Sequence, residues 1–100
     1  MEIIIQFVQG EKNPTAEALV REKLDDIYKK YDWLIRADVF FKEEKDSNRG
    51  RENICEIRLS CPGPRIFAQS REKSYESAVT KTIDDLNVLL KKRKSELQSY

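Results

Sequence analysis

Residues 54–64 read Ile-Cys-Glu-Ile-Arg-Leu-Ser-Cys-Pro-Gly-Pro, and this stretch determines how the second half of the chain folds. Apolar and polar residues alternate over Ile54–Cys61, which predicts a β-strand with one buried and one solvated face. The predicted inward side chains are Cys55, Ile57, Leu59 and Cys61. Pro62-Gly63-Pro64 predicts a turn, and Arg65–Ser70 predicts the strand that returns from it.

Two more strands are predicted on the N-terminal side of this hairpin. Ile35–Glu44 alternates between apolar and polar residues, and the polar segment Lys45–Asn53 that follows it contains a glycine. This composition predicts a hairpin loop over Lys45–Asn53. Met1–Gln9 also alternates and ends at Gly10, so it predicts the first strand of the chain.

Helical spacing of apolar residues predicts two helices. Asn13 and Pro14 are typical of a helix N-cap and first helical position, and the helix they begin is predicted to run to about Tyr31. Its apolar stripe consists of Ala16, Val20, Leu24, Ile27 and Tyr31. Ser74 is the predicted cap of the second helix. The stripe of that helix consists of Tyr75, Val79, Ile83, Leu86, Leu90 and Leu97.

The resulting order β-α-β-β-β-α predicts an α+β fold, a two-layer sandwich with a four-stranded mixed sheet and both helices on one face. The first crossover is expected to be right-handed, which makes the first two strands parallel. The two hairpins make the remaining pairs antiparallel and give the strand order 1-2-3-4. With 100 residues, the chain is predicted to be a single domain over residues 1–100.

Composition argues against several classes of function. The chain has no histidine, two cysteines and three glycines, so histidine-based catalysis, a four-ligand zinc site and a glycine-rich phosphate loop are all disfavoured. Cys55 and Cys61 would lie about 20 Å apart on one strand, and they are interpreted as small core residues. No catalytic residue, metal ligand or cofactor is predicted, and an enzyme is not expected.

Apolar runs are also too short for a membrane span, which needs about 18 residues. Met1–Phe7 lacks the features of a signal peptide, so no membrane partner is expected and a cytoplasmic location is predicted.

Charge is unevenly distributed although the net charge is only +1. Residues 1–50 contain 9 basic and 11 acidic side chains, whereas residues 51–100 contain 10 basic and 7 acidic ones. Lys91-Lys92-Arg93-Lys94 concentrates the positive charge near the C-terminus. A basic terminus favours nucleic-acid binding, but alone it is also typical of a solvated helix end.

Several segments, taken in this order and spacing, resemble the ribosome hibernation-promoting factor family, also called protein Y or the sigma-54 modulation/S30EA group. The segments are Asn13-Pro14, Val20–Leu24, Ala37–Lys42, Pro62-Gly63, Ile66–Ala68 and Lys91–Lys94. The resemblance covers nearly the whole chain and is to the short form of the family. It implies a fold like that of double-stranded-RNA-binding domains.

The same resemblance implies a partner and a function. A member of this family is expected to bind 16S rRNA in the decoding region of the small ribosomal subunit, and not DNA. It thereby inhibits translation and stabilises idle ribosomes during stress.

The residues expected to contact RNA are all basic: Lys23, Lys30, Lys81, Lys91, Lys92, Arg93 and Lys94. On the first helix, Lys23 and Lys30 share one flank; on the second helix, positions 81, 85, 88 and 92 share another. If both flanks border the groove between the helices, they form a cationic channel for phosphates. The resemblance implies a basic flank on the second helix, but Asp85 and Val88 occupy two of its four positions. Arginine at both is expected to raise subunit affinity, unless the flank faces solvent or another protein.

The outer sheet face supports an alternative function. Four apolar side chains are predicted to point away from the helices: Ile4, Phe40, Ile54 and Phe67. Such a cluster is typical of a contact surface, so a protein-interaction module or a weak homodimer is the alternative to ribosome binding. The same residues would be ordinary if long Lys and Arg side chains cover them. A small hydrolase is the least supported hypothesis, because no catalytic set can be named.

Overall fold

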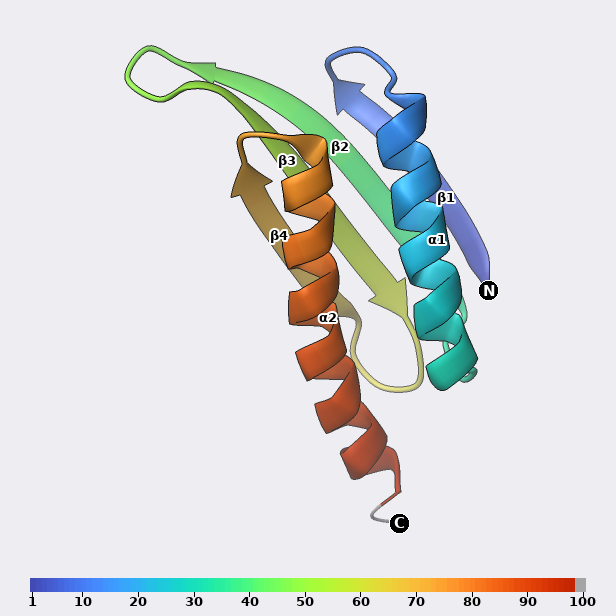
Figure 1. Cartoon of the computed structure of the whole chain (residues 1–100). Coiled ribbons are helices and arrows are strands. Elements are labelled where there is room, and N and C mark those ends of the chain that lie inside the picture. The colour runs from blue at the N-terminus through green and yellow to red at the C-terminus, as the bar shows by residue number, and fades with distance from the viewer. Residues whose placement is uncertain (99–100) are drawn as a thin grey trace.

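A computed structural model describes residues 1–98 of the chain, and Figure 1 shows how its helices and strands are arranged. In chain order these are β1 (Glu2–Gln9), α1 (Pro14–Lys30), β2 (Arg36–Asp46), β3 (Gly50–Ser60), β4 (Ile66–Glu72) and α2 (Tyr75–Leu97). The order β-α-β-β-β-α is the one predicted from the sequence.

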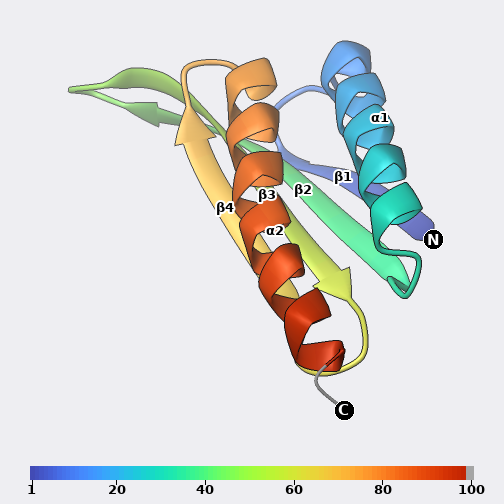
Figure 2. The same ribbon diagram turned by 60° about the horizontal axis from the view of Figure 1, so that its bottom comes forward.

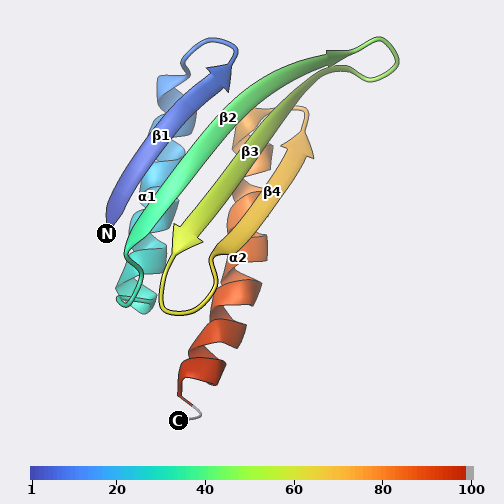
Figure 3. The ribbon, with the colours of Figure 1, turned by 180° about the vertical axis from the view of Figure 1, so that it is seen from behind.

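The four strands form one mixed sheet in the order β1-β2-β3-β4. β1 and β2 are parallel, and the β2–β3 and β3–β4 pairs are antiparallel. Figure 3 shows the open face of this sheet, and Figure 2 shows both helices on the opposite face. The predicted α+β sandwich, its strand order and the one-sided placement of the helices are confirmed.

Both helices begin at the predicted caps. The side chain of Asn13 accepts a hydrogen bond of 3.0 Å from the backbone N–H of Ala16, and Ser74 Oγ accepts one of 3.1 Å from Ser77. From these caps α1 and α2 run side by side in the same direction, with α1 over β1 and β2 and α2 over β3 and β4 (Figure 1). Their C-terminal ends therefore lie toward the same end of the molecule.

The core lies between the helices and the inner sheet face. Phe41 is fully buried, stacks on Phe7 at 4.9 Å between ring centroids, and meets the edge of Tyr75 at 5.0 Å. Leu24 and Leu86 contribute fully buried side chains from the two helices. Truncating a buried leucine to alanine typically costs about 2–5 kcal/mol, so this core holds the two layers together.

The two cysteines differ in burial. Cys55 is fully buried as predicted, but Cys61 is only half-buried, so its assignment to the core is wrong. Cys61 lies just beyond the end of β3, where it packs against the edge of the core and its Sγ lies 3.3 Å from Nη1 of Arg93 on α2.

The β2–β3 hairpin corrects the prediction of a loop over Lys45–Asn53. β2 continues to Asp46 and β3 begins at Gly50, so the connection is only residues 47–49. Gly50 has a φ of +77°, a conformation that glycine adopts without steric cost. This end of the hairpin extends past the helices (Figure 1). Residues 45–51 are exposed, and the polar side chains of Glu52 and Asn53 are buried, so a polar sequence is compatible with strands at this end of the hairpin.

Candidate nucleic-acid interface

Lys23 and Lys30 lie on the side of α1 that faces α2. The starts of the two helices line one cavity, to which α1 contributes Leu19 and α2 contributes Tyr75 and Glu76. At 100° per residue, Lys23 and Lys30 lie about 40° and about 20° from Leu19 around the helix axis. Both predicted lysines of α1 therefore border the space between the helices.

The predicted flank of α2, positions 81, 85, 88 and 92, faces away from α1. Glu76 marks the side of α2 that faces α1, and positions 81, 85, 88 and 92 lie about 120–180° around the helix from it. Asp85 and Val88 instead line a shallow groove with residues 67–69 of β4. We call this surface the β4-side flank; it consists of Lys81, Asp85, Val88, Leu89, Lys92 and Glu96.

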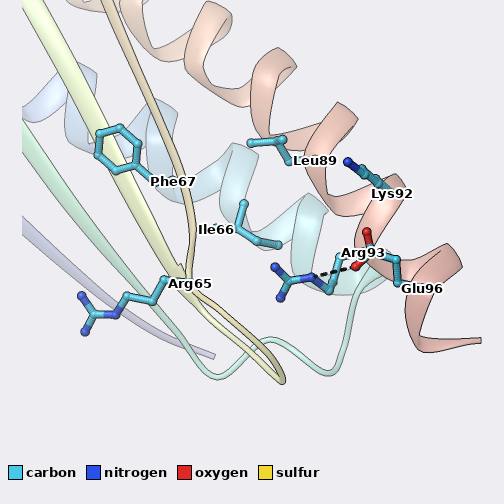
Figure 4. A pocket seen from close by; sticks show the side chains of 7 residues that line it. All are labelled: Arg65, Ile66, Phe67, Leu89, Lys92, Arg93 and Glu96. Carbon is cyan, nitrogen blue, oxygen red and sulfur yellow. Dashed lines mark ion pairs between the residues drawn. The ribbon is translucent and has the colours of Figure 1, made fainter.

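The expected channel between two matching basic flanks is therefore wrong. Lys92 and Leu89 line a second groove with Arg65 and Phe67, beside the edge strand β4 (Figure 4). Sequence spacing shows which residues share a side of a helix, but it does not show which neighbour that side meets. Leu89 and Glu96 were not singled out from the sequence, although they continue the same three- and four-residue spacing.

The basic run at the end of α2 is distributed around the helix. Lys94 lies five full turns after Glu76, so it shares the side that faces α1. Lys91 faces solvent and lines a shallow surface with Val88 and Lys92. Lys94 thus joins Lys23 and Lys30 on the inter-helix side, whereas Lys92 belongs to the β4-side flank.

Arg93 has a structural role that the sequence did not predict. One guanidinium nitrogen, Nη1, donates to the carbonyl oxygens of Pro62 at 2.9 Å and Pro64 at 2.8 Å, and it lies 3.3 Å from Cys61 Sγ. Gly63 has a φ of +90°, and a Cβ atom there would lie 3.0 Å from the same nitrogen. Arg93 therefore fastens the β3–β4 turn to α2, and this leaves its side chain poorly placed for an external phosphate.

The six lysines of the predicted set share one electrostatic property. Within residues 1–98, none of Lys23, Lys30, Lys81, Lys91, Lys92 and Lys94 forms an ion pair, whereas Arg93 pairs with Glu96 at 3.7 Å (Figure 4). Lys30, Lys91, Lys92 and Lys94 lie in or near the last turns of the two helices. Because the helices are parallel, these cations gather toward one end of the helical layer, where the helix dipoles favour positive charge.

The outer sheet face has paired charges instead. Arg36 binds Asp38 at 2.8 Å, Arg58 binds Glu56 at 2.8 Å, and Arg71 binds Glu44 at 2.7 Å. The hydrogen bonds from Arg36 to Asp38, and those from Arg71 to Glu44 and Glu52, raise the pKa of each arginine above its ordinary value. These ion pairs make the face close to self-neutral.

The predicted apolar cluster on this face is only partly exposed. Ile54 is 3% exposed, so its assignment as an exposed residue is wrong. Lys42 and Arg71 are its cross-strand neighbours, and their long side chains account for its burial. Ile4 and Phe40 are half-buried, and the Arg58 guanidinium lies 5.1 Å from the centre of the Phe40 ring.

Phe67 is 48% exposed and is the most exposed of the four predicted contact residues. Its ring lies at the edge strand β4, where it also lines the groove with Leu89 and Lys92 (Figure 4). The four residues therefore do not form one exposed apolar surface.

In residues 1–98, no three side chains of the metal-binding types His, Cys, Asp and Glu lie close enough together to hold an ion. Over the same part of the chain, no helix has the length and apolar character needed to cross a membrane.

Burial raises the pKa of the Cys61 thiol, and the nearby Arg93 opposes this shift.

Comparison with known proteins identifies a family and several similar solved structures, of which one is described below. The family model described as "Sigma 54 modulation protein / S30EA ribosomal protein" matches residues 3–98. A solved structure described as a ribosomal subunit interface protein from Coxiella burnetii superposes with a TM-score of 0.81 and 21% sequence identity. The superposition covers 95% of this chain and 99% of that one. Comparison with curated protein sequences finds no match.

Proposed function

The chain belongs to the sigma 54 modulation protein / S30EA ribosomal protein family, and we propose that it binds 16S rRNA of the small ribosomal subunit. Through this binding it inhibits translation and stabilises idle ribosomes. The observation that carries the proposal is the set of unpaired lysines toward one end of the helical layer, in a chain whose other charged face is largely self-neutral.

Phosphate binding explains why these lysines have no internal partners. A lysine that is already paired with a carboxylate would have to exchange that partner for a phosphate, whereas an unpaired lysine gives up only bound water and counterions. Lys23, Lys30 and Lys94 lie on the inter-helix side, and Lys91 lies beside them on the solvent-facing side. Contacts of this kind fix the position of a protein on folded RNA without reading its bases.

The composition of this surface favours RNA shape over exposed bases as the recognised feature. No aromatic side chain was predicted among the lysines, and single-stranded bases are usually held by aromatic stacking. Folded RNA is recognised mainly through phosphates and 2′-hydroxyl groups, which lysine side chains can contact. We therefore propose a binding protein without catalytic activity, acting in the cytoplasm where ribosomes work.

The test is co-sedimentation with purified small ribosomal subunits. Lys23→Glu with Lys30→Glu is expected to weaken binding by about 10- to 100-fold, because two phosphate contacts become repulsive. Lys12→Glu with Lys45→Glu is the matched control: both lysines are exposed, make no ion pair within residues 1–98, and lie outside the proposed surface. This control is expected to bind within about threefold of the unmodified protein.

Two results would contradict the proposal. One is unchanged binding of the Lys23/Lys30 variant in the presence of native thermal stability. The other is an equal loss of binding in the control variant, which would show that total charge matters and that the position of the lysines does not.

A further inference from the structure

The β4-side flank of α2 is exposed and has no covering element. Val88 is 71% exposed and Leu89 is 38% exposed, which is unusual for apolar residues in the middle of a long helix. Lys81, Asp85 and Lys92 form no ion pair within the described residues 1–98. An apolar centre between unpaired charges is a surface that lacks a partner.

The order of charges along this flank identifies a partner. Along the flank, positive Lys81 is followed by negative Asp85, then by the apolar pair Val88–Leu89. Positive Lys92 and negative Glu96 come after this pair. When a second copy of this helix lies antiparallel to the first, each charged position of one copy lies opposite a position of opposite charge in the other. Two copies in antiparallel orientation would therefore be complementary at each position, whereas a parallel arrangement would place like charges together.

We propose that the chain forms a two-fold symmetric homodimer in which the β4-side flank packs antiparallel against the same flank of a second copy. The symmetry axis passes between Val88 and Leu89, so that Val88 meets Leu89 of the second copy. The same axis pairs Asp85 with Lys92 across the interface. It also brings Lys81 to Glu96, which binds Arg93 of its own chain at 3.7 Å and would be shared between the two cations. Each contact occurs twice, as it must at a two-fold interface.

The free edge of β4 is a second, independent observation that supports a symmetry axis at Val88–Leu89. β4 is the last strand of the sheet, so within residues 1–98 its outer edge has no strand beside it. Residues 67–69 line one groove with Asp85, Val88 and Leu89, and Gln69 is the middle residue of β4 (Ile66–Glu72). An axis at Val88–Leu89 therefore passes near the middle of β4, where two copies of this strand can pair antiparallel. Strand pairing at a free edge is a common mode of association.

The dimer surface is separate from the surface proposed for RNA. The β4-side flank lies about 120–180° around α2 from the side that faces α1. Lys23, Lys30 and Lys94 therefore stay uncovered in the dimer, whereas Lys81 and Lys92 are matched by carboxylates of the second copy. This arrangement also gives Asp85 and Val88, which depart from a basic flank, a defined role.

A charge exchange tests the proposal by analytical ultracentrifugation over a range of protein concentrations. Asp85→Lys alone places lysine opposite Lys92, and Lys92→Asp alone places aspartate opposite Asp85; each is expected to weaken dimerisation by at least about tenfold. The double variant Asp85→Lys with Lys92→Asp restores opposite charges and is expected to return to within about threefold of the unmodified protein. All of these side chains are exposed, so thermal stability should change little.

Val88→Glu tests the apolar centre, and Thr80→Glu is the matched control on the exposed surface of the same helix. The first is expected to abolish the dimer because it brings carboxylates to the symmetry axis beside Asp85; the second is expected to leave the dimer intact. A protein that stays monomeric at millimolar concentration, or a double exchange variant that does not recover, would overturn the proposal.

Measuring the affinity for ribosomal subunits distinguishes the proposed dimer surface from the proposed RNA-binding surface. Asp85→Arg with Val88→Arg is expected to remove the dimer and leave subunit affinity within about threefold, because the flank does not face RNA. If this variant binds subunits at least about tenfold more tightly, with a steeper salt dependence, the flank faces RNA and the dimer proposal is wrong. Lys23→Glu with Lys30→Glu should still dimerise normally even where it no longer binds subunits.

Discussion

The outer sheet face and the helical layer carry similar kinds of charge but arrange them differently. On the sheet face three arginines, Arg36, Arg58 and Arg71, have carboxylate partners, with Arg36–Asp38 and Arg58–Glu56 both at 2.8 Å. In the helical layer the predicted cations are lysines, such as Lys30 and Lys94, without an ion pair in residues 1–98. Charges that pair internally stabilise the fold, whereas unpaired charges remain available to a partner.

The chemistry of arginine and lysine side chains explains why arginine forms the internal ion pairs and lysine remains unpaired. The planar guanidinium of arginine can hold a carboxylate with two nitrogens, and both Nε and Nη2 of Arg36 donate to Asp38. Lysine is a flexible point charge that adapts to phosphates in varied positions. The net charge of +1 conceals the difference, because it sums a self-neutral face with a basic end of the helical layer.

Arg71 is the charged residue of the sheet face whose removal should destabilise the fold most. Arg71 donates to Glu44 at 2.7 Å and to Glu52 at 3.2 Å, and these two glutamates lie directly opposite each other on β2 and β3. Arg71→Ala leaves two facing carboxylates, and nearly buried Glu52 then keeps only Arg49 at 3.9 Å, so the substitution is expected to lower the free energy of unfolding more than any other described below. Urea denaturation measures this loss.

A second substitution shows whether charge repulsion causes that loss. Adding Glu52→Gln to Arg71→Ala removes one of the facing carboxylates and should recover about half of the lost stability. Arg65→Ala, which removes an exposed arginine without an ion pair in residues 1–98, should change stability by less than about 0.5 kcal/mol. Equal effects of Arg65→Ala and Arg71→Ala would remove the distinction between paired and unpaired charges.

Arg93 differs from the lysines of the helical layer because it has partners within the chain. Its bonds to the carbonyls of Pro62 and Pro64 predict that Arg93→Ala lowers the free energy of unfolding by about 1–2 kcal/mol. Arg93→Lys should not restore the full stability, because one ammonium group on a different stem does not reproduce the guanidinium geometry. Lys92→Ala, at the neighbouring position, serves as the control in the same thermal and urea measurements and should be nearly neutral.

The lysines proposed to bind RNA should show the opposite behaviour. Lys30→Ala with Lys94→Ala is expected to change the free energy of unfolding by less than about 0.5 kcal/mol, because neither side chain has an internal ion pair in the described residues. The same variant should bind small subunits about tenfold more weakly. A loss of stability comparable to that of Arg71→Ala would show that these lysines serve the fold.

Cys55, in the core, should affect the free energy of unfolding only at alkaline pH. Burial raises the pKa of the Cys55 thiol from 9.0 to about 12. The neutral thiol is favoured in the fold, so its contribution to stability is complete below pH 9 and is lost as the pH rises toward 12. We expect the free energy of unfolding to be unchanged near pH 7 and to fall above pH 9, and to fall less steeply in Cys55→Val.

Part of that alkaline loss should remain in the variant, because burial also raises the pKa of Tyr75. Alkylation of the native protein gives a second readout: half-buried Cys61 should react and buried Cys55 should not. Rapid alkylation of Cys55 at pH 8 would contradict the account of a closed core.

The fold was predictable because local signals agreed along the whole chain. Asn13 and Ser74 mark the helix starts, and the alternation around Ile57 marks the buried strand face. The sequence does not reveal the strand ends within Lys45–Asn53, because every residue there is polar or glycine, including the buried Glu52 and Asn53, and the alternation that identifies strands is absent.

The candidate site was less predictable because it depends on how elements face one another. The spacing of Lys81, Asp85, Val88 and Lys92 correctly places them on one side of α2, but only the structure shows that this side meets β4. The role of Arg93 depends on a turn about thirty residues away in the sequence. No local pattern distinguishes it from the lysines on either side.

If the unpaired lysines of the helical layer bind ribosomal phosphates, subunit binding must depend strongly on the salt concentration. Affinity of the unmodified protein for purified small subunits should fall linearly on a plot of log affinity against log salt concentration. Lys23→Glu with Lys30→Glu should reduce the slope by about two, one for each lost contact. Binding that does not change between low and high salt, or a slope that the substitutions leave unchanged, would contradict the account.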